Sequence, residues 1–405
     1  MNKKNIWLIS QYTSPEKFGY HTKHHFLSIF FNKKYNIKIF SSTSSSYHNF
    51  GIQKSKSFHK KKIGNVDYTL LKNSFYKNTK INKILGSIEF SIRLLFHNPL
   101  LNKNKPKLIF ITVPNSIISV SSILIAKLVR AKTVVEVRDI WPLAQQEYYG
   151  ISRIHPYYIM YKFLEWFFHK YADMIVSPIP HYKLYLDESK IKYNNYSFIP
   201  QFTIVKKNQN IKNQKNSILT GVYSGNLNTF RPILEFIRAV EILNNRNVTC
   251  NFIFIGSGDK LLEAKKYVKN KKIENIIFKG ALNKEKANLL IQKADFGLSL
   301  LYDTKLYNKY GLCSLKNFEY MAYNIPIFSV GSNETCSDLS KFFGAGFCIQ
   351  TNPKEIAKSL ENFLFNFDTN KKMALKSRAF LEEKRSVSFV GNELFRMFDN
   401  LNNDA

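Results

Sequence analysis

The sequence predicts an α/β protein made of two doubly wound, Rossmann-like domains in tandem. Short β-rich segments alternate with longer helical patterns along the whole chain, as in βαβ units with parallel strands. The 405 residues are too many for one hydrophobic core, which stops growing at about 250 to 300 residues. A segment rich in Lys, Asn and Gln at 205–217 separates two ordered patterns. We therefore expect a first domain over 1–204, a linker at 205–217 and a second domain over 218–385.

In the first domain, runs of apolar and β-branched residues predict strands, and apolar residues at helical spacing predict helices. The strands are expected at Ile6–Ser10, Ile37–Phe40, Lys107–Val113, Thr133–Val137, Met174–Val176 and Tyr196–Ile199. The helices are expected at His21–Asn32, Ile81–Phe96, Ile117–Arg130 and Tyr157–Tyr171.

The second domain repeats this alternation. Its strands are expected near Leu219–Ser224, Asn251–Ile255, Ile276–Phe278, Phe296–Leu301, Ile325–Val330 and Phe347–Ile349. A final helix at Val387–Leu401, within the last segment 386–405, is expected to pack back across the first domain. Because ligands of open α/β sheets bind at the carboxyl ends of the strands, the two domains are expected to face a common cleft.

Composition limits the classes of function. With 44% hydrophobic and 15% aromatic residues the chain has enough apolar material to fold. The 60 Lys and Arg against 29 Asp and Glu give a net charge of +31. Either a lysine-rich compositional bias or a basic face for an anionic partner explains this charge.

The longest apolar stretch, Ile117–Val129, is shorter than a membrane span. The sequence has no secretory signal, and its four cysteines lack zinc or disulfide spacing, so a cytoplasmic location is expected.

Three loops that follow strands contain candidate functional residues. The first follows Leu219–Ser224 and contains Gly225 and Arg231. Glycine lets the backbone approach a ligand closely, and an arginine at the start of a helix can bind a diphosphate through two hydrogen bonds. A turn glycine with a solvated arginine is the alternative.

The second loop, Gly256-Ser257-Gly258, resembles half of a dinucleotide fingerprint. The third glycine and the acidic ribose partner are missing, so a nicotinamide or flavin cofactor is not expected. The backbone amides of this loop can line a nucleotide pocket, and a plain strand-to-helix turn explains the glycines equally well.

The third loop leads into a helix with Ser314 as its expected N-cap and Lys316 in its first turn, at the positive end of the helix dipole. Glu319 follows three residues later on the same helix face, so the two side chains can hold the phosphate and the ribose of one ligand. The alternative is a surface ion pair between Lys316 and Glu319.

The run from Ser314 to Ala322, Ser-x-Lys-x-x-Glu-Tyr-Met-Ala, precedes a proline-containing strand and resembles the donor-site motif of glycosyltransferase family 4. Enzymes of this kind build bacterial surface polysaccharides. Further landmarks of the family occur in order along nearly the whole chain. They are Phe18-Gly19-Tyr20, Arg138-Asp139-Ile140-Trp141-Pro142, Tyr171–Val176, Tyr223–Asn226, Phe254–Gly258 and Ala294–Gly297.

The resemblance implies a GT-B fold and a retaining hexosyl- or N-acetylhexosaminyltransferase with no cofactor and no bound metal. The implied donor is a nucleotide-diphosphate sugar held by the second domain. The implied acceptor is a polyprenyl-linked saccharide on the first domain, in the synthesis of lipopolysaccharide or capsule. An enzyme of this kind is expected in the cytoplasm, peripheral on the inner face of the cell membrane, with the anionic membrane surface as a partner.

By position in the family motifs, Glu319 is expected to bind the donor ribose. Arg231 and Lys316 are expected to hold the diphosphate and to stabilise the leaving group. Gly19 and Gly225 are expected to leave room for the donor, and Gly256 and Ser314 complete the expected donor site.

The sequence departs from the family at three positions. Arg138-Asp139 stands where many members have His-Asp, which makes Asp139 the candidate for contact with the reacting sugar or the acceptor. Gly311 stands where many members have a first glutamate, and Asn226 where an arginine is frequent. The expected catalytic residues are therefore Asp139, Arg231 and Lys316.

Two further groups of residues have alternative explanations. The aromatic-rich helix at 157–170 is expected to be a core helix, with contact to a lipid-linked acceptor at the membrane interface as the alternative. His21, His24 and His25 are expected at solvated helix positions, because nothing in their spacing demands a metal or a general base.

Two other functions remain possible from the sequence. A nucleotide-sugar epimerase of the same fold would convert the donor with no acceptor present. A nucleic-acid-binding protein is suggested only by the charge, and the sequence contains no helix-turn-helix, zinc or RNA-binding motif. Nucleic acid is therefore not among the expected partners.

Overall fold

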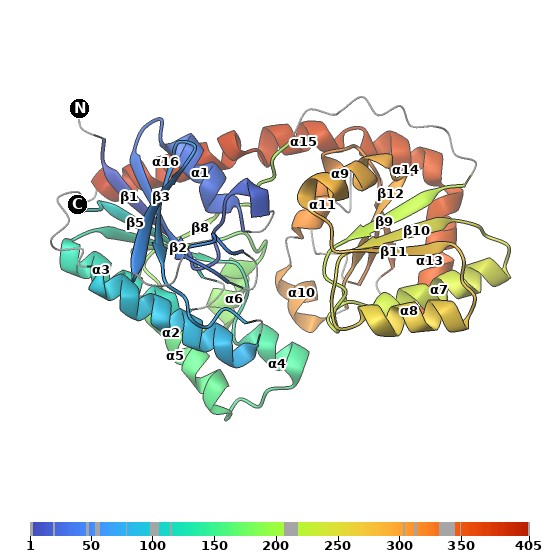
Figure 1. The fold of residues 1–405 in the computed structure, drawn as a ribbon, viewed down its shortest axis with the longest axis horizontal. Coiled ribbons are helices and arrows are strands. Elements are labelled where there is room, and N and C mark those ends of the chain that lie inside the picture. The colour runs from blue at the N-terminus through green and yellow to red at the C-terminus, as the bar shows by residue number, and fades with distance from the viewer. Residues whose placement is uncertain are drawn as a thin grey trace. The chain divides into compact units, whose positions relative to one another are not determined.

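The computed structural model describes residues 3–18, 21–45, 48–52, 57–77, 79–97, 105–113, 116–205, 218–302, 304–311, 314–331, 345–348 and 350–403. The chain forms two compact units (Figure 1). Unit 1 comprises Met1–Pro200 and Val387–Ala405, and unit 2 comprises Gln201–Ser386. Residues 206–217, nearly all of the expected linker, lie outside the described residues.

Unit 1 contains an eight-stranded sheet in the order β3-β4-β2-β1-β5-β6-β7-β8. All neighbouring strands are parallel except the antiparallel pair β3 and β4. The strands are β1 (Asn5–Ile9), β2 (Asn36–Ser42), β3 (Phe58–Ile63), β4 (Val66–Leu71), β5 (Leu108–Val113), β6 (Lys132–Val137), β7 (Met174–Ser177) and β8 (Tyr196–Phe198). Each strand expected from the sequence in this part of the chain is present.

The β3–β4 hairpin was not expected from the sequence. Lys60, Lys61 and Lys62 lie in β3, at the edge of the sheet, where half-buried and exposed residues alternate. Lysines on an edge strand discourage pairing with another chain. The polar composition of such a strand hides the alternation that identifies buried strands.

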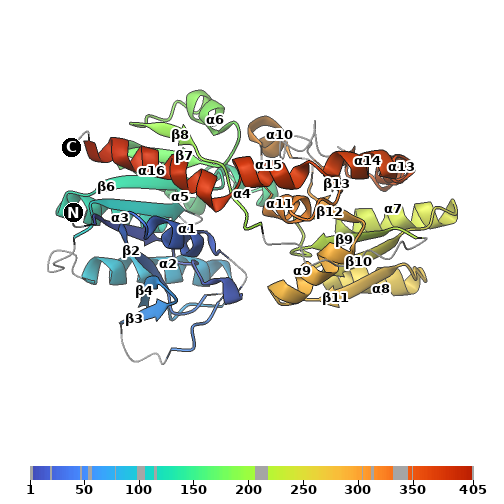
Figure 2. The same ribbon diagram turned by 90° about the horizontal axis from the view of Figure 1, so that it is seen from above.

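The helices of unit 1 lie in two layers (Figures 1 and 2). One layer contains α1 (Lys23–Phe31) and α16 (Val387–Asn403), and the other contains α2 (Lys80–Phe96), α3 (Ile117–Val129) and α5 (Pro156–Tyr171). The short helices η1 (Glu16–Phe18), α4 (Leu143–Tyr149) and α6 (Tyr182–Glu188) were not expected, because so few residues show little periodicity.

The C-terminal helix α16 packs on α1 through aromatic rings. The ring of Phe395 lies 5.0 Å from that of Phe30 and 5.0 Å from that of Phe31, measured between centroids. Phe398 is fully buried, with its ring centroid 5.4 Å from that of Phe31 and 6.1 Å from that of Phe110 on β5. The end of the chain thus supplies part of the core of unit 1.

Unit 2 contains a six-stranded parallel sheet in the order β11-β10-β9-β12-β13-β14. The strands are β9 (Thr220–Ser224), β10 (Asn251–Ile255), β11 (Ile276–Gly280), β12 (Phe296–Leu300), β13 (Ile327–Val330) and β14 (Ala345–Cys348). The helices are α7 (Ile233–Asn245), α8 (Leu261–Asn270), α9 (Lys284–Lys293), α10 (Lys305–Tyr310), α11 (Leu315–Met321), α13 (Pro353–Phe365), α14 (Phe367–Ala374) and α15 (Ser377–Lys384).

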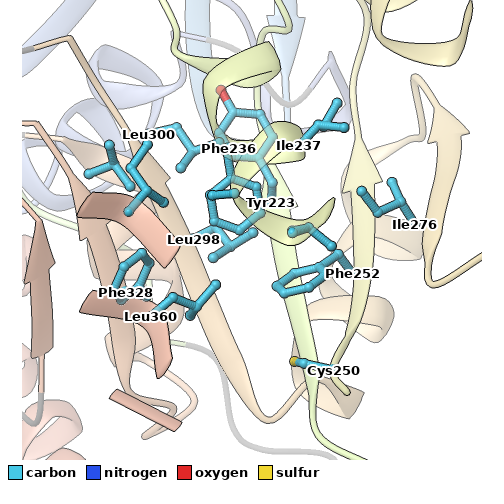
Figure 3. Close-up of a cluster of buried hydrophobic side chains, with 14 of the residues drawn as sticks. Tyr223, Phe236, Ile237, Cys250, Phe252, Ile276, Leu298, Leu300, Phe328 and Leu360 are labelled. Atoms are coloured by element: carbon cyan, nitrogen blue, oxygen red, sulfur yellow. The ribbon is translucent and has the colours of Figure 1, made fainter. Parts of the chain in front are cut away.

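Both faces of the unit 2 sheet are covered, as in a doubly wound fold. The core on one face contains Tyr223, Phe236 and Phe252 and includes residues of α7 and α13 (Figure 3). The core on the other face includes Phe318 and Tyr320 of α11. The strand order reverses between β9 and β12, and ligands of such sheets bind beyond the carboxyl ends of the strands at this point.

Candidate functional site

The loop after β9 brings Gly225 against the end of the Lys316 side chain. A Cβ atom added to Gly225 would lie 3.1 Å from Lys316 Nζ and 3.3 Å from the Tyr223 hydroxyl oxygen. A larger residue would therefore displace the ammonium group. The backbone N–H of Gly225 donates to the carbonyl of Ile255 at 2.9 Å, so this amide is already used within the fold.

The loop after β10 packs backbone to backbone against the Gly225 loop. A Cβ on Gly256 would lie 1.8 Å from the carbonyl oxygen of Gly225, and one on Gly258 would lie 2.1 Å from that of Leu227. The backbone N–H of Gly256 donates to the Gly280 carbonyl at 2.8 Å. Gly256 and Gly258 therefore allow this loop and the Gly225 loop to approach each other. The Gly256 amide already has a hydrogen-bond partner, the Gly280 carbonyl.

Lys316, in the first turn of α11, has an uncommon environment for a lysine. Its Nζ donates to the Tyr223 hydroxyl at 3.2 Å and lies 4.3 Å from the centroid of the Tyr223 ring. Burial, followed by the positive charge of Arg231, lowers the pKa of the ammonium well below its usual 10.5, while Glu319 raises it. A nearby anion would offset both unfavourable effects.

Tyr223 orients the lysine from within the hydrophobic core. Its ring belongs to the buried cluster of Figure 3, and burial raises the pKa of its hydroxyl to about 12. The hydroxyl is therefore neutral near pH 7. It donates to the Asn226 carbonyl at 2.7 Å and accepts from Lys316. The orientation of Lys316 by Tyr223 was not expected from the sequence, although Tyr223 lies within one of the family landmarks.

Arg231 lies just before α7 and supplies a second cation. Its guanidinium makes one long contact, 3.5 Å from Nη1 to the Leu300 carbonyl at the end of β12. Its Nε is buried and has no hydrogen-bond partner among the described residues. In that part of the chain no carboxylate forms an ion pair with Arg231 or with Lys316. Two neighbouring cations with no ion-paired carboxylate among the described residues make this corner of unit 2 a candidate anion site.

Glu319 pairs with a different lysine from the one considered in the sequence. Its carboxylate forms an ion pair with Lys284 of α9 and remains partly exposed. The alternative of a surface ion pair between Lys316 and Glu319 is therefore not what the structure shows. Lys284 was not a candidate, because it lies 35 residues away in the sequence.

Tyr320 fixes the position of α11 on the sheet. Its hydroxyl accepts from the backbone N–H of Ser224 and donates to the Leu298 carbonyl, both at 3.1 Å. A Cβ on Gly297 would lie 2.3 Å from the Tyr320 ring, so glycine is needed there. These contacts hold Lys316 and Glu319 beside β9. Tyr320 and Gly297 both lie in segments that are landmarks of the family.

Ser314 occupies the N-cap position of α11 with extended backbone angles, φ −87° and ψ 109°. The N-cap position is the predicted one, and the side chain makes no capping hydrogen bond. Gly19 and Tyr20 of the first-domain landmark lie outside the described residues.

Asp139 follows β6 in unit 1 and has an exposed side chain. Surrounding protein atoms raise the pKa of its carboxyl by desolvation, and Arg138 lowers it. Because Asp139 is exposed, solvent around its carboxylate limits this desolvation. Asp139 belongs to unit 1, whereas Gly225, Arg231 and Lys316 belong to unit 2.

The expectation of solvated helix positions was wrong for His24 and His25, which are buried between α1 and the sheet, and His21 precedes α1 and is half-buried. His24 is 1% exposed, and burial lowers its pKa to about 3. Its Nε2 lies 2.7 Å from Thr112 Oγ1, and its Nδ1 lies 3.3 Å from Thr13 Oγ1. His25 is also buried, with Nδ1 2.9 Å from the Tyr68 hydroxyl.

The His24 contacts extend to a buried carboxylate. Thr112 Oγ1 donates to Glu136 Oε2 at 2.8 Å, and Lys23 forms an ion pair with the same carboxylate. Because the Thr112 hydrogen is used on Glu136, we assign the proton of neutral His24 to Nε2, which donates to Thr112. This network joins α1, β5 and β6.

The aromatic helix α5 is a core helix on one side only. Tyr158, Tyr161, Leu164 and Phe168 are buried. Ile159, Phe163 and Trp166 are 56%, 56% and 46% exposed. The expectation of a helix buried on most sides was therefore wrong for its outer face.

No helix in the described part of the chain is long and apolar enough to cross a membrane. Within the same residues, no cluster of three or more His, Cys, Asp or Glu side chains is arranged to hold a metal ion.

Residues 202–380 match the family model of glycosyl transferases group 1, which covers almost all of unit 2. No curated protein matches the sequence.

Solved structures similar to this chain include sucrose-phosphate synthase (tll1590) from Thermosynechococcus elongatus, with a TM-score of 0.73, 10% identity and 100% of both chains covered. Anabaena Alr3699/HepE in complex with UDP and glucose has a TM-score of 0.70 and 9% identity, covering 98% of this chain and 100% of that one. WaaG, a glycosyltransferase involved in lipopolysaccharide biosynthesis, has a TM-score of 0.68 and 9% identity, covering 96% and 98%. At these identities the likeness shows the fold.

Proposed function

Since the chain is a glycosyltransferase of the GT-B fold and its residues 202–380 match the group 1 family model, we propose that it is a retaining enzyme of the family 4 type that uses a nucleotide-diphosphate sugar. The donated group is a hexosyl or N-acetylhexosaminyl residue. The acceptor is a polyprenyl-linked saccharide in the synthesis of a surface polysaccharide, lipopolysaccharide or capsule.

The main observation in favour of a donor site is the pair of cations in unit 2, Arg231 and Lys316. Arg231 and Lys316 have no carboxylate partner among the described residues, and each charge disfavours the other. A diphosphate would supply the missing anion and hydrogen-bond acceptors. Alr3699/HepE, which has the same fold, is known in complex with UDP and glucose. Glu319, held by Lys284, is a suitable acceptor for the ribose hydroxyls.

In this mechanism the chain acts mainly through electrostatics. As the bond between the sugar and the diphosphate breaks, negative charge grows on the leaving phosphate. Arg231 and Lys316 stabilise that charge without reorganising, because Tyr223 and Gly225 already hold the lysine in place. Asp139 of unit 1 is the proposed contact for the reacting sugar or the acceptor. The Gly256 loop supports the site by packing against the Gly225 loop.

We place the acceptor at the inner face of the membrane, so in this proposal the enzyme is cytoplasmic and peripheral. The net charge of +31 supports attraction to an anionic membrane. WaaG, similar in fold, takes part in lipopolysaccharide biosynthesis. Both points favour a lipid-linked acceptor over a soluble sugar.

The donor site is tested with Lys316→Ala and Glu319→Ala. After a panel of nucleotide sugars has identified the donor by thermal stabilisation, we expect Lys316→Ala to lower kcat/KM by roughly 10²- to 10³-fold, as for loss of one group that stabilises a developing oxyanion. Glu319→Ala should raise the donor KM by roughly 10- to 100-fold, through loss of hydrogen bonds to a charged group.

Lys358→Ala, at an exposed position of α13, is the matched control and should leave turnover unchanged. Wild-type turnover in both site variants would disprove the proposed donor site. Conversion of the donor to an isomeric sugar nucleotide with no acceptor present would show an epimerase instead of a transferase.

A further inference from the structure

Three helices of unit 1 expose an apolar face. Helices α2, α3 and α5 lie side by side in one layer, where α2 contacts α3 and α3 contacts α5 (Figure 1). Their inner sides contribute to the core of unit 1. Their outer sides, where a soluble helix usually has charged residues, present aliphatic and aromatic side chains.

Helix α2 is apolar on both of its sides. Its inner side includes the buried residues Phe90 and Leu94. Its outer side has six large apolar residues that are 38% to 83% exposed and follow one another at helical spacing. They are Ile81, Leu85, Ile88, Ile92, Leu95 and Phe96. The exposed stripe of α2 is therefore apolar, and an exposed apolar surface of this kind marks a site that contacts lipid or another protein.

The two neighbouring helices extend this apolar surface. Leu124 and Leu128 are exposed on α3, and Ile159, Phe163 and Trp166 are exposed on α5. Within each helix these residues are three or four positions apart, so they share one side.

Helix α13 of unit 2, in the same protein, shows the usual pattern, with Lys354, Glu355 and Lys358 at exposed positions. The apolar outer surface of α2, α3 and α5 is thus a local feature of unit 1. Composition alone would have produced it on α13 as well.

Where the structure describes the side chains, the exposed charges on these helices are all positive. Helix α3 has no acidic residue, and the single carboxylates of α2 and α5, Glu89 and Glu165, are ion-paired with Arg93 and Lys162 and only 13% and 3% exposed. Among the residues of these helices whose burial is described, Lys127, Arg130 and Lys170 are exposed, and Lys162 is partly exposed beside Glu165.

The basic and aromatic side chains also meet. Lys170 Nζ lies 4.8 Å from the centroid of the Trp166 ring, and Lys127 Nζ lies 4.5 Å from that of Tyr171. Amphipathic aromatic rings and long basic side chains with apolar stems suit the boundary between lipid headgroups and acyl chains.

We propose that this surface, the α2–α3–α5 face, docks on an anionic lipid bilayer. Its apolar side chains enter the boundary between headgroups and acyl chains, and Lys127, Arg130 and Lys170 contact lipid phosphates. Anionic lipid fits better than a second copy of the chain, because a symmetric dimer would bring the same positive charges near one another with no exposed carboxylate to offset them.

The inference extends the membrane location in the proposed function to a particular surface. It does not involve the donor site, which lies in unit 2. Donor binding and membrane docking can therefore fail separately.

The test is sedimentation of the full chain with vesicles of equal parts phosphatidylglycerol and phosphatidylcholine, and with phosphatidylcholine alone. We expect binding to the anionic vesicles that weakens at high salt. The triple variant Ile88→Ser/Ile92→Ser/Phe163→Ser should bind at least about tenfold more weakly, through loss of buried apolar surface. Lys127→Gln and Lys170→Gln should each weaken binding roughly fivefold.

The matched control is Leu262→Ser/Phe365→Ser, which removes two unit 2 side chains that are 80% and 89% exposed. It should bind the vesicles like the wild type. Thermal stabilisation by the donor, measured on every variant, shows whether unit 2 is intact and reports on the donor site independently.

Tryptophan fluorescence gives a second measurement. Trp166 is 46% exposed, and Trp7 is 1% exposed. Vesicle binding should shift the emission to shorter wavelengths, and Trp166→Phe should remove most of that shift. The proposal is overturned if the wild type does not bind anionic vesicles or if the triple variant binds them as well as the wild type. Self-association that the triple variant abolishes, without vesicle binding, would assign the face to a dimer.

Discussion

Lys316 shows at the level of single residues how the candidate site depends on contacts between distant parts of the chain. The family motif identified Lys316, Arg231 and Glu319 from the sequence. The group that orients the lysine, Tyr223, lies 93 residues away, and Glu319 is held by Lys284. The lowered pKa of Lys316 follows from burial and from Arg231, and neither effect is visible in a local motif.

His24 provides a pH-dependent test at the same scale. Its folded-state pKa is about 3, against 6.5 for an ordinary histidine. Between these values the unfolded chain binds a proton that the folded chain does not, so stability falls as the pH drops from 6.5 towards 3. Replacing His24 by Gln should flatten the pH dependence of the unfolding free energy by up to about 1.4 kcal/mol per pH unit.

The measurement is urea unfolding of wild type and His24→Gln at several pH values between neutral and mildly acidic. His181→Gln, at an exposed position, is the control and should keep the wild-type slope. Equal slopes for wild type and His24→Gln would mean that His24 can accept a proton in the folded chain.

At the scale of elements, the loops after β9 and β10 act as one structural unit. From the sequence, Gly225 was expected to leave room for a ligand, and the amides of the Gly256 loop were expected to line a nucleotide pocket, with a plain turn as the alternative. In the structure Gly256 and Gly258 instead permit the approach of the Gly225 loop, whose glycine makes room for Lys316. A glycine pattern alone does not distinguish these reasons, because the approaching group comes from another part of the chain.

Gly256→Ala tests this packing. The new Cβ would lie 1.8 Å from the Gly225 carbonyl oxygen, a backbone atom that cannot move alone. We expect a loss of about 3 kcal/mol in unfolding free energy, as for severe overpacking, together with weaker donor binding.

Gly280→Ala separates steric overlap from backbone strain. Its φ is +70°, and a Cβ there would meet nothing within 4 Å. It should cost only about 1 kcal/mol, the strain of a left-handed residue. Chemical denaturation of both variants gives the comparison, and equal losses would show that backbone angle, not loop packing, requires Gly256.

At the scale of the whole molecule, the chain returns to its first unit at its end. Helix α16 belongs to unit 1, although it follows the last element of unit 2. Phe395 and Phe398 pack on α1 and β5. The stability of unit 1 therefore depends on residues nearly 200 positions beyond the rest of its sequence.

Phe398→Ala measures this dependence. Removal of a fully buried phenylalanine should cost about 3–5 kcal/mol of unfolding free energy. All three tryptophans, Trp7, Trp141 and Trp166, lie in unit 1, so their fluorescence during urea unfolding reports on that unit.

The control is Phe365→Ala, which removes a ring of unit 2 that is 89% exposed. It should change the unfolding free energy of unit 1, measured by tryptophan fluorescence, by less than about 0.5 kcal/mol. If Phe398→Ala left the fluorescence transition at its wild-type position, α16 would contribute little to the stability of unit 1.

The sequence by itself determined the α/β class, the expected buried strands of both sheets and the motif that contains Lys316 and Glu319. These features are local, because apolar periodicity and short motifs repeat within a few residues. Helix α16 was also visible as a periodic pattern, and its aromatic side chains suit a packed interface.

Only the tertiary structure decided which groups meet. It placed Lys284 on Glu319, buried His24 between Thr13 and Thr112, and left the outer side of α2 exposed. It also added the lysine-rich strand β3 at the sheet edge. The physical reason is that burial and pairing depend on segments far apart in the chain, and a periodic pattern reveals an apolar side without revealing what covers it.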